Sequence, residues 1–198
     1  MATSPTDIAN QALGMVGNQP ITSIDDASVA ANLCARFFPR LRDELLRNHP
    51  WKFAMRRASL PASDVAPVWS TMKAFPLPAD CLRLLALDLY DPDIRWQVEG
   101  GNVVAELDGP LDVLYTARVE DVAAWDATFT SAMCARLAME LAMPLAQSGT
   151  LRQQMESEYR RTLREARSLD SMQAAPGKFY ADQLVDARRI GVNGGWTA

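Results

Sequence analysis

Apolar residues recur with the period of an α-helix near both ends of the chain. The sequence SPTD at positions 4–7 combines a serine, a proline and an acid as helix starts do, and it predicts a helix from Pro5 to about Val16. A longer amphipathic helix is expected from Ser28 to about Asn48. The first quarter of the chain is therefore predicted to be mainly helical.

Helical periodicity returns after Asp126, a residue type that caps helix N-termini. Over the next twenty or so positions only Arg136 and Glu140 are charged, which is typical of a helix buried on most sides. The sequence QSGT separates this helix from a highly charged one expected over about residues 151–171. Because the link is short, we expect the two helices to pack as an antiparallel pair.

The middle of the chain has a different pattern, in which prolines recur and short apolar runs replace the helical stripe. Strands are the better interpretation of such runs. The sequence EGGN at residues 99–102 is expected to form a hairpin turn. The expected strands cover residues 51–55, 82–89, 95–98, 103–107 and 111–118.

These elements predict an α+β protein that is mainly α. An antiparallel helical bundle is expected from the N- and C-terminal helices, residues 1–49 and 127–173, with a small β module inserted at 50–126. At 198 residues the chain suits one core with a small insertion better than two independent domains. Residues 174–198 lack a clear period but are rich in apolar side chains, so we expect a C-terminal extension or arm that a partner orders.

The composition is that of an ordinary globular protein, with 48% apolar and 22% charged residues. No apolar run reaches the roughly 18 residues that span a bilayer, and MATSPTDIAN lacks the features of a signal peptide. We therefore expect neither secretion by a signal peptide nor a membrane partner. Three separated cysteines without a C-x-x-C pair suit neither a disulfide framework nor a zinc site, which favours a reducing cytoplasm.

Charge is distributed unevenly along a chain whose net charge is −4. Residues 36–57 carry seven Arg or Lys against two acids, whereas residues 88–126 carry ten acids against two arginines. Opposite charges on one protomer suit head-to-tail association. The basic cluster could instead contact nucleic acid, although it matches no known reader module. The expected interaction residues are Arg36, Arg40, Arg47, Lys52, Arg56, Arg57, Phe179, Tyr180 and Trp196.

The only histidine, His49, lies in the stretch LLRNHPWKFAMRR. No nucleophile signature or metal-ligand spacing surrounds it, so we expect no catalytic, metal-binding or cofactor-binding residue. The residue before Pro50 is pushed out of helical geometry, which ends the preceding helix. We interpret His49, Pro50, Trp51 and Phe53 as a structural joint, with His49 closing the helix end and the two aromatic side chains turned inward.

Glycan hydrolysis is an alternative function, because two suitably spaced carboxylates are enough for it. Acids on turns beside strands are more often only solvated. The candidate carboxylates crowd the expected β module, and they are Asp88, Asp91, Asp93, Glu99, Glu106 and Asp108.

Several segments, in their order along the chain, resemble the head-to-tail adaptors of short-tailed bacteriophages (podoviruses), the family called tail tubular protein A or gatekeeper. They are DIANQALGMVGNQPITSIDD, HPWKFAMRRASLP, FPLPADCLRLLAL and the two C-terminal helical segments, so that the resemblance covers about residues 6–173. It implies a structural virion protein that forms a dodecameric ring, joins the portal protein to the tail nozzle protein, and lines the channel through which genomic DNA passes.

The same resemblance implies assembly in the host bacterial cytoplasm, location in the virion tail and, in many relatives, support of the tail fibres. An acidic β module facing the channel would repel DNA phosphates and prevent sequence-independent sticking. Some relatives have been suggested to cleave glycans, which keeps the carboxylate alternative open. The resemblance does not extend to the expected arm.

Overall fold

The computed structural model describes residues 4–63, 67, 71–89 and 94–173. Helices and two small sheets make up this part of the chain, so the expected α+β class with mainly helical content is confirmed. Each helix begins with a serine or aspartate whose side chain accepts a backbone N–H, as the local sequence predicts. The helices are α1 (Pro5–Met15), α2 (Val29–Arg47), α3 (Ala127–Ala146) and α4 (Gly149–Met172).

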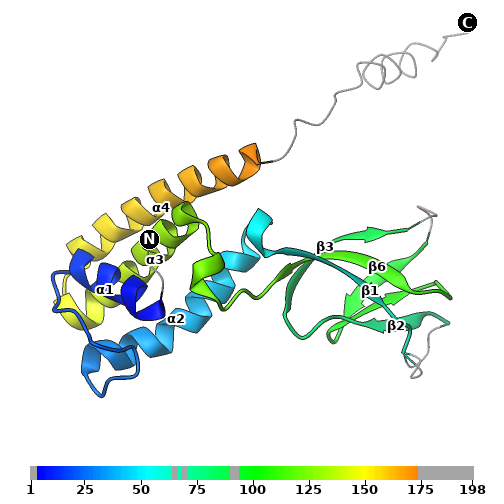
Figure 1. Cartoon of the computed structure of the whole chain (residues 1–198), viewed down its shortest axis with the longest axis horizontal. Coiled ribbons are helices and arrows are strands. Elements are labelled where there is room, and N and C mark those ends of the chain that lie inside the picture. The colour runs from blue at the N-terminus through cyan, green and yellow to red at the C-terminus, as the bar shows by residue number, and fades with distance from the viewer. Residues whose placement is uncertain (1–3, 64–66, 68–70, 90–93, 174–198) are drawn as a thin grey trace, which may run out of the picture.

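Helix α3 is the central element of the helical part and packs against α1, α2 and α4 (Figure 1). It is buried on most sides, as its nearly uncharged sequence predicts. Gln147 adopts the left-handed conformation after α3 and turns the chain back into α4. The two helices therefore run antiparallel along most of their length.

The strands form two antiparallel three-stranded sheets among the described residues. Sheet A has the order β1-β6-β3 and sheet B the order β2-β5-β4. Buried side chains of both sheets, including Phe75, Val103 and Val113, form one apolar cluster that is separate from the helical core. The strands are β1 (Met55–Leu60), β2 (Lys73–Pro76), β3 (Cys81–Asp88), β4 (Trp96–Glu99), β5 (Asn102–Ala105) and β6 (Leu111–Ala117).

The hairpin expected at EGGN joins β4 to β5. Glu99 pairs with Asn102, so the loop between them has two residues. Those residues, Gly100 and Gly101, have φ angles of 53° and 84°. A two-residue hairpin turn with positive φ at both positions matches the twist of the strands, and glycine adopts it without strain.

The structure corrects the start of the β module. The strand predicted over residues 51–55 is wrong, because Lys52–Ala54 form a short 3-10 helix and β1 begins only at Met55. Strand β2 was not expected, whereas the four other strands lie within two residues of their predicted positions. The chain turns at Trp51 because its indole N–H donates to the Leu45 carbonyl, which holds the ring against α2.

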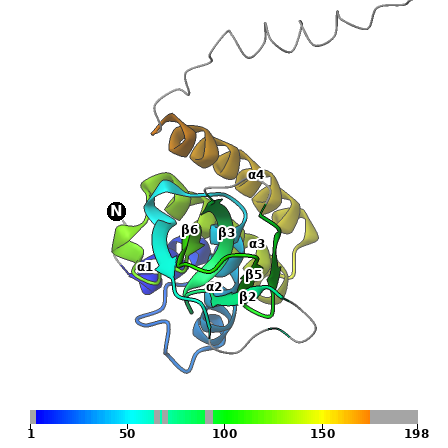
Figure 2. The ribbon, with the colours of Figure 1, turned by 90° about the vertical axis from the view of Figure 1, so that its right-hand side faces the viewer.

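The ends of the segment that carries the strands pack into the helical core. Trp51 and Ala54 before β1, and Val119, Val122 and Trp125 after β6, all belong to the same buried cluster as α1, α2 and α3. Viewed from the end that carries the sheets, the strands lie in front of the helices (Figure 2). Within the described residues no helix has the length and hydropathy needed to cross a membrane.

Candidate functional site

The chain crosses between the helical core and the sheets at two tryptophans. Trp51 precedes β1, and its indole N–H donates to the Leu45 carbonyl at 2.9 Å. Trp125 follows β6, and its indole N–H donates to the Val119 carbonyl at 3.0 Å. Both rings are buried, Trp51 with 1% exposure, so each crossing is fixed by a large apolar side chain whose polar atom is satisfied.

Phe129 on α3 connects the two crossings. Its ring meets both Trp51 and Trp125 edge to face, with centroids 5.0 Å apart in each case. Phe53 makes a third such contact at 5.0 Å, and Phe38 of α2 stacks on Trp125. Aromatic pairs of this geometry contribute about 0.5–1.5 kcal/mol each beyond the area they bury. We call this group the aromatic joint.

His49 extends the joint to α4. Its Nε2 lies 3.0 Å from Oδ2 of Asp170, and the other carboxylate oxygen accepts the backbone N–H of Lys52 at 2.8 Å. Helix α2 ends with Asn48 as its C-cap residue, so the His49 ring does not close the helix but links the joint to a distant helix. Pro50 is half-buried between these contacts. Sequence reasoning missed Asp170, because nothing local marks a partner that lies 121 positions away.

Ion pairs among the described residues involve some cations of the expected basic cluster and leave the others free. Arg56 pairs with Asp80 at 2.9 Å, and Arg40 lies 3.8 Å from Glu44 and 3.7 Å from Glu140. The other expected cations are exposed and form no ion pair within the described part of the chain. They are Arg36, Arg47, Lys52 and Arg57, while Phe179, Tyr180 and Trp196 lie outside the described residues.

Most of the described acids of residues 88–126 also have partners or structural roles. Asp121 and Asp126 cap helix N-termini, and three others pair with cations: Glu106 with Arg95, Asp108 with Lys73, and Glu120 with Arg42. Asp91 and Asp93 lie outside the described residues. In the described part, the acids of this segment with neither an ion pair nor a capping role are Asp88, Glu99 and Asp112. The surface charge is therefore smaller than the sequence count indicates, and more localised.

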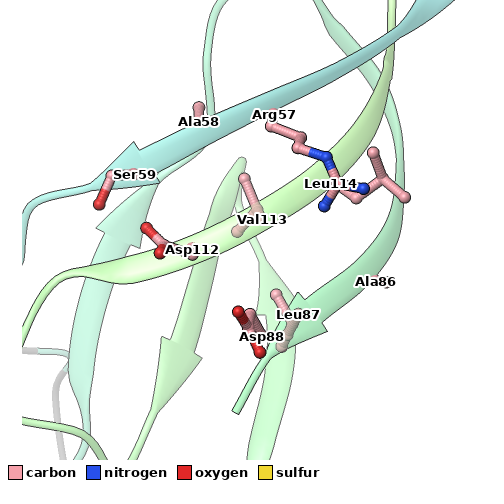
Figure 3. A pocket seen from close by; sticks show the side chains of 9 residues that line it. All are labelled: Arg57, Ala58, Ser59, Ala86, Leu87, Asp88, Asp112, Val113 and Leu114. Atoms are coloured by element: carbon pink, nitrogen blue, oxygen red, sulfur yellow. The ribbon is translucent and has the colours of Figure 1, made fainter.

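Two of these acids lie in a hollow of about 500 Å³ on the outer face of sheet A (Figure 3). Residues paired across strands point to the same side of a sheet. Ser59, Asp112 and Asp88 therefore form one row across β1, β6 and β3. The neighbouring row consists of Arg57, Leu114 and Ala86.

Asp88 and Asp112 are directly opposite each other on neighbouring strands. Like charges in that arrangement destabilise a sheet, and neither carboxylate forms an ion pair within the described residues, although Arg57 lines the same hollow. Arg57 extends along Leu114 rather than toward the carboxylates (Figure 3). Asp112 was absent from the candidate carboxylates. Strand alternation places it outward, but its pairing with Asp88 depends on a register that the sequence does not reveal.

Strand β4 exposes a second, apolar surface. Trp96 and Val98 are 47% and 50% exposed, although the residues opposite them, Ala105 and Val103, are fully buried. The side chains of β4 thus share a face with the apolar cluster of the sheets but are only partly covered. An edge strand with uncovered apolar side chains is a common feature of interaction surfaces.

Two of the three thiols are made less reactive by burial, and the described residues form no metal-binding group. Burial raises the pKa of Cys34 to about 11 and that of Cys134 to about 12, so both stay protonated at neutral pH. Burial and then the Asp80 charge raise the pKa of Cys81. Among the described residues, no three His, Cys, Asp or Glu side chains form a group that could hold a metal ion.

Comparison with known proteins adds no assignment. No protein-family model matches the sequence, and no curated protein matches it either.

Replacing Trp51 with alanine should lower the free energy of unfolding by about 3–5 kcal/mol, because a fully buried indole leaves a cavity among Phe129 and its neighbours. Urea unfolding followed by far-UV circular dichroism measures the change. Trp96→Ala is the matched control, and a half-exposed side chain should cost about 1 kcal/mol or less. Equal losses in the two variants would contradict the aromatic joint.

Replacing Asp170 with alanine should lower the free energy of unfolding by about 1–3 kcal/mol, because it leaves the Lys52 N–H and the His49 ring without their acceptor at a site that is 6% exposed. Asp170→Asn keeps one acceptor oxygen and should cost less. The exposed Asp25→Ala serves as control. A double-mutant cycle with His49→Ala measures the coupling, and a coupling energy of zero would argue against the link.

Proposed function

We propose that this chain is the subunit of a head-to-tail adaptor ring of a short-tailed bacteriophage. The observation that carries the proposal is the location of unneutralised charge on an elongated molecule (Figure 1). Exposed Arg36 lies on α2 in the helical part, while two acids, Asp88 and Asp112, lie with one cation, Arg57, on the sheets at the other end. Such a subunit can bind the next copy head to tail, and contacts of that kind close into rings when the rotation permits.

The segments that resemble adaptors also contribute contacts that define this fold, which supports the proposal. In the first segment, the Asn10 side chain accepts the Ile21 N–H at 2.8 Å and donates to the Ile21 carbonyl at 2.9 Å. Thr6 accepts the Ile24 N–H in the same loop. In the second segment, His49 and Trp51 form part of the joint. A resemblance at residues with defined structural roles is more informative than one at solvated positions.

In the proposed ring the subunit joins the portal protein to the tail nozzle protein, and DNA passes through the lumen without sequence-specific binding. The net charge of −4 and the ion pairs of Arg42 and Arg56 weaken the attraction to phosphates, although other cations of α2 and β1 remain exposed. The exposed face of β4, with Trp96 and Val98, suits a protein partner. Tail fibres are a further partner in the proposed assembly.

Mixing the purified chain with the portal and nozzle proteins of the same genome should yield a particle that contains a ring of this 21.8 kDa chain, with twelve copies by the resemblance. Native mass spectrometry measures the stoichiometry, and electron microscopy locates the ring between the two partners. A mixture in which the chain remains a free monomer would overturn the adaptor proposal.

Glycan hydrolysis is the second candidate, and the pair Asp88 and Asp112 in the hollow is the observation that favours it. We expect the purified chain to release no reducing sugar from host cell-wall or capsule polysaccharide. The matched variants are Asp88→Asn and Asp112→Asn, with Asp108→Asn as the control outside the hollow. Sugar release that both hollow variants abolish and the control retains would favour the hydrolase instead.

A further inference from the structure

We propose that the hollow on sheet A binds the side chains of Arg36 and Arg40 from a second copy of this chain, and that this contact repeats around the ring. The inference rests on the proposed function, since it names the surfaces by which adaptor subunits would meet. It commits to a second copy as the occupant because the complementary charges occur on the two ends of the same molecule.

The hollow presents two carboxylates on neighbouring strands, with Arg57 on the row beside them. Residues directly opposite on antiparallel strands have Cβ atoms about 4.5–5.5 Å apart, so the Asp88 and Asp112 side chains start from neighbouring positions. Both residues are exposed and have no ion pair within the described part of the chain. Carboxylates bind guanidinium groups through charge-assisted, often bidentate hydrogen bonds. The adjacent Leu114 and Ala86 offer apolar surface to the aliphatic part of an incoming arginine.

Helix α2 presents two positive charges at a matching spacing. Arg36 and Arg40 are four residues apart on the exposed side of the helix, where Cβ atoms are about 5–6 Å apart. Arg36 has no ion pair among the described residues. Arg40 has a side-chain exposure of 56% and reaches its two glutamates only at 3.7 and 3.8 Å, beyond normal hydrogen-bond length. Its guanidinium lies over the Phe37 ring, which helps to hold it in place.

The two surfaces cannot neutralise each other within one copy. The half of α2 that carries Arg36 lies in the helical part, whereas the hollow lies on the sheets at the far end of the molecule (Figure 1). Each surface holds a like-charge pair, whose repulsion falls when it meets the other pair. Arg57 in the hollow, and Glu44 and Glu140 beside Arg40, make the net charge of each surface smaller than that of its pair. Complementary patches on opposite ends of a protomer give a heterologous contact, which is the type that generates rings.

Charge reversal tests the contact in the full-length chain. One variant carries Asp88→Lys and Asp112→Lys, a second carries Arg36→Glu and Arg40→Glu, and a third carries all four changes. Because all four side chains are exposed, each variant should fold, as far-UV circular dichroism would verify. Assembly is followed by native mass spectrometry and sedimentation, with and without the portal and nozzle proteins.

We expect each two-site variant to raise the protein concentration needed for half-assembly by at least about tenfold, because like charges then face each other across the contact. The four-site variant should assemble again, since the signs are exchanged on both surfaces. Matched controls outside the two surfaces are Glu99→Lys with Asp108→Lys, and Arg152→Glu with Arg164→Glu. Both controls should assemble as the unmodified chain does.

The outcomes separate this inference from the proposed function. The docking of α2 into the hollow is overturned if the ring forms normally in both two-site variants. It is also overturned if the four-site variant fails to restore the ring. Either outcome leaves the adaptor proposal standing. A chain that remains monomeric even with portal and nozzle proteins overturns both. Loss of assembly in the controls to the same extent would mean that net charge, not this contact, controls assembly, and would also overturn the docking.

Discussion

The ring of Phe129 contacts Trp51 and Trp125 at the two places where the chain passes between the helical core and the sheets. Each indole is also tied to a backbone carbonyl six residues before it. Moving the sheets relative to the helices would therefore require both large rings to leave the core together. The charged surfaces at the two ends are held in a fixed relation by this contact, and a repeating assembly depends on such a relation.

A single carboxylate connects the end of α4 to the same region. Asp170 receives the backbone N–H of Lys52 and bonds to His49, so the first turn after α2 and the last turn of α4 share one buried acceptor. Arg167 on α4 adds a hydrogen bond to the Asn48 carbonyl at 3.4 Å. A buried carboxylate with two donors is costly to separate from them, which ties the last described helix to the crossing before β1.

The sequence indicates those parts of the fold that local interactions determine. Ser28 and Asp126 mark helix starts because capping acts within three residues, and EGGN specifies its hairpin by backbone conformation alone. The sequence predicts a strand where the 3-10 helix after Trp51 lies, because the acceptor that fixes the Lys52 N–H is 118 positions away. The pairing of Asp88 with Asp112 across β3 and β6 could likewise not be predicted, since strand register arises from tertiary pairing.

Charge counts along the sequence cannot distinguish a paired ion from a free one, whereas the structure shows which charges are paired. Pairs such as Glu120 with Arg42 remove much of the apparent asymmetry, while the like-charge pair of Asp88 and Asp112 remains. Such a pair costs a few tenths of a kcal/mol or more, and conflicts of this kind concentrate at functional surfaces. Salt screens exposed charges beyond about 8 Å, so the hollow can specify how copies align but adds little affinity. In an assembly, much of the affinity would have to come from apolar surface, and half-exposed Trp96 and Val98 on β4 provide such a surface on the neighbouring sheet B.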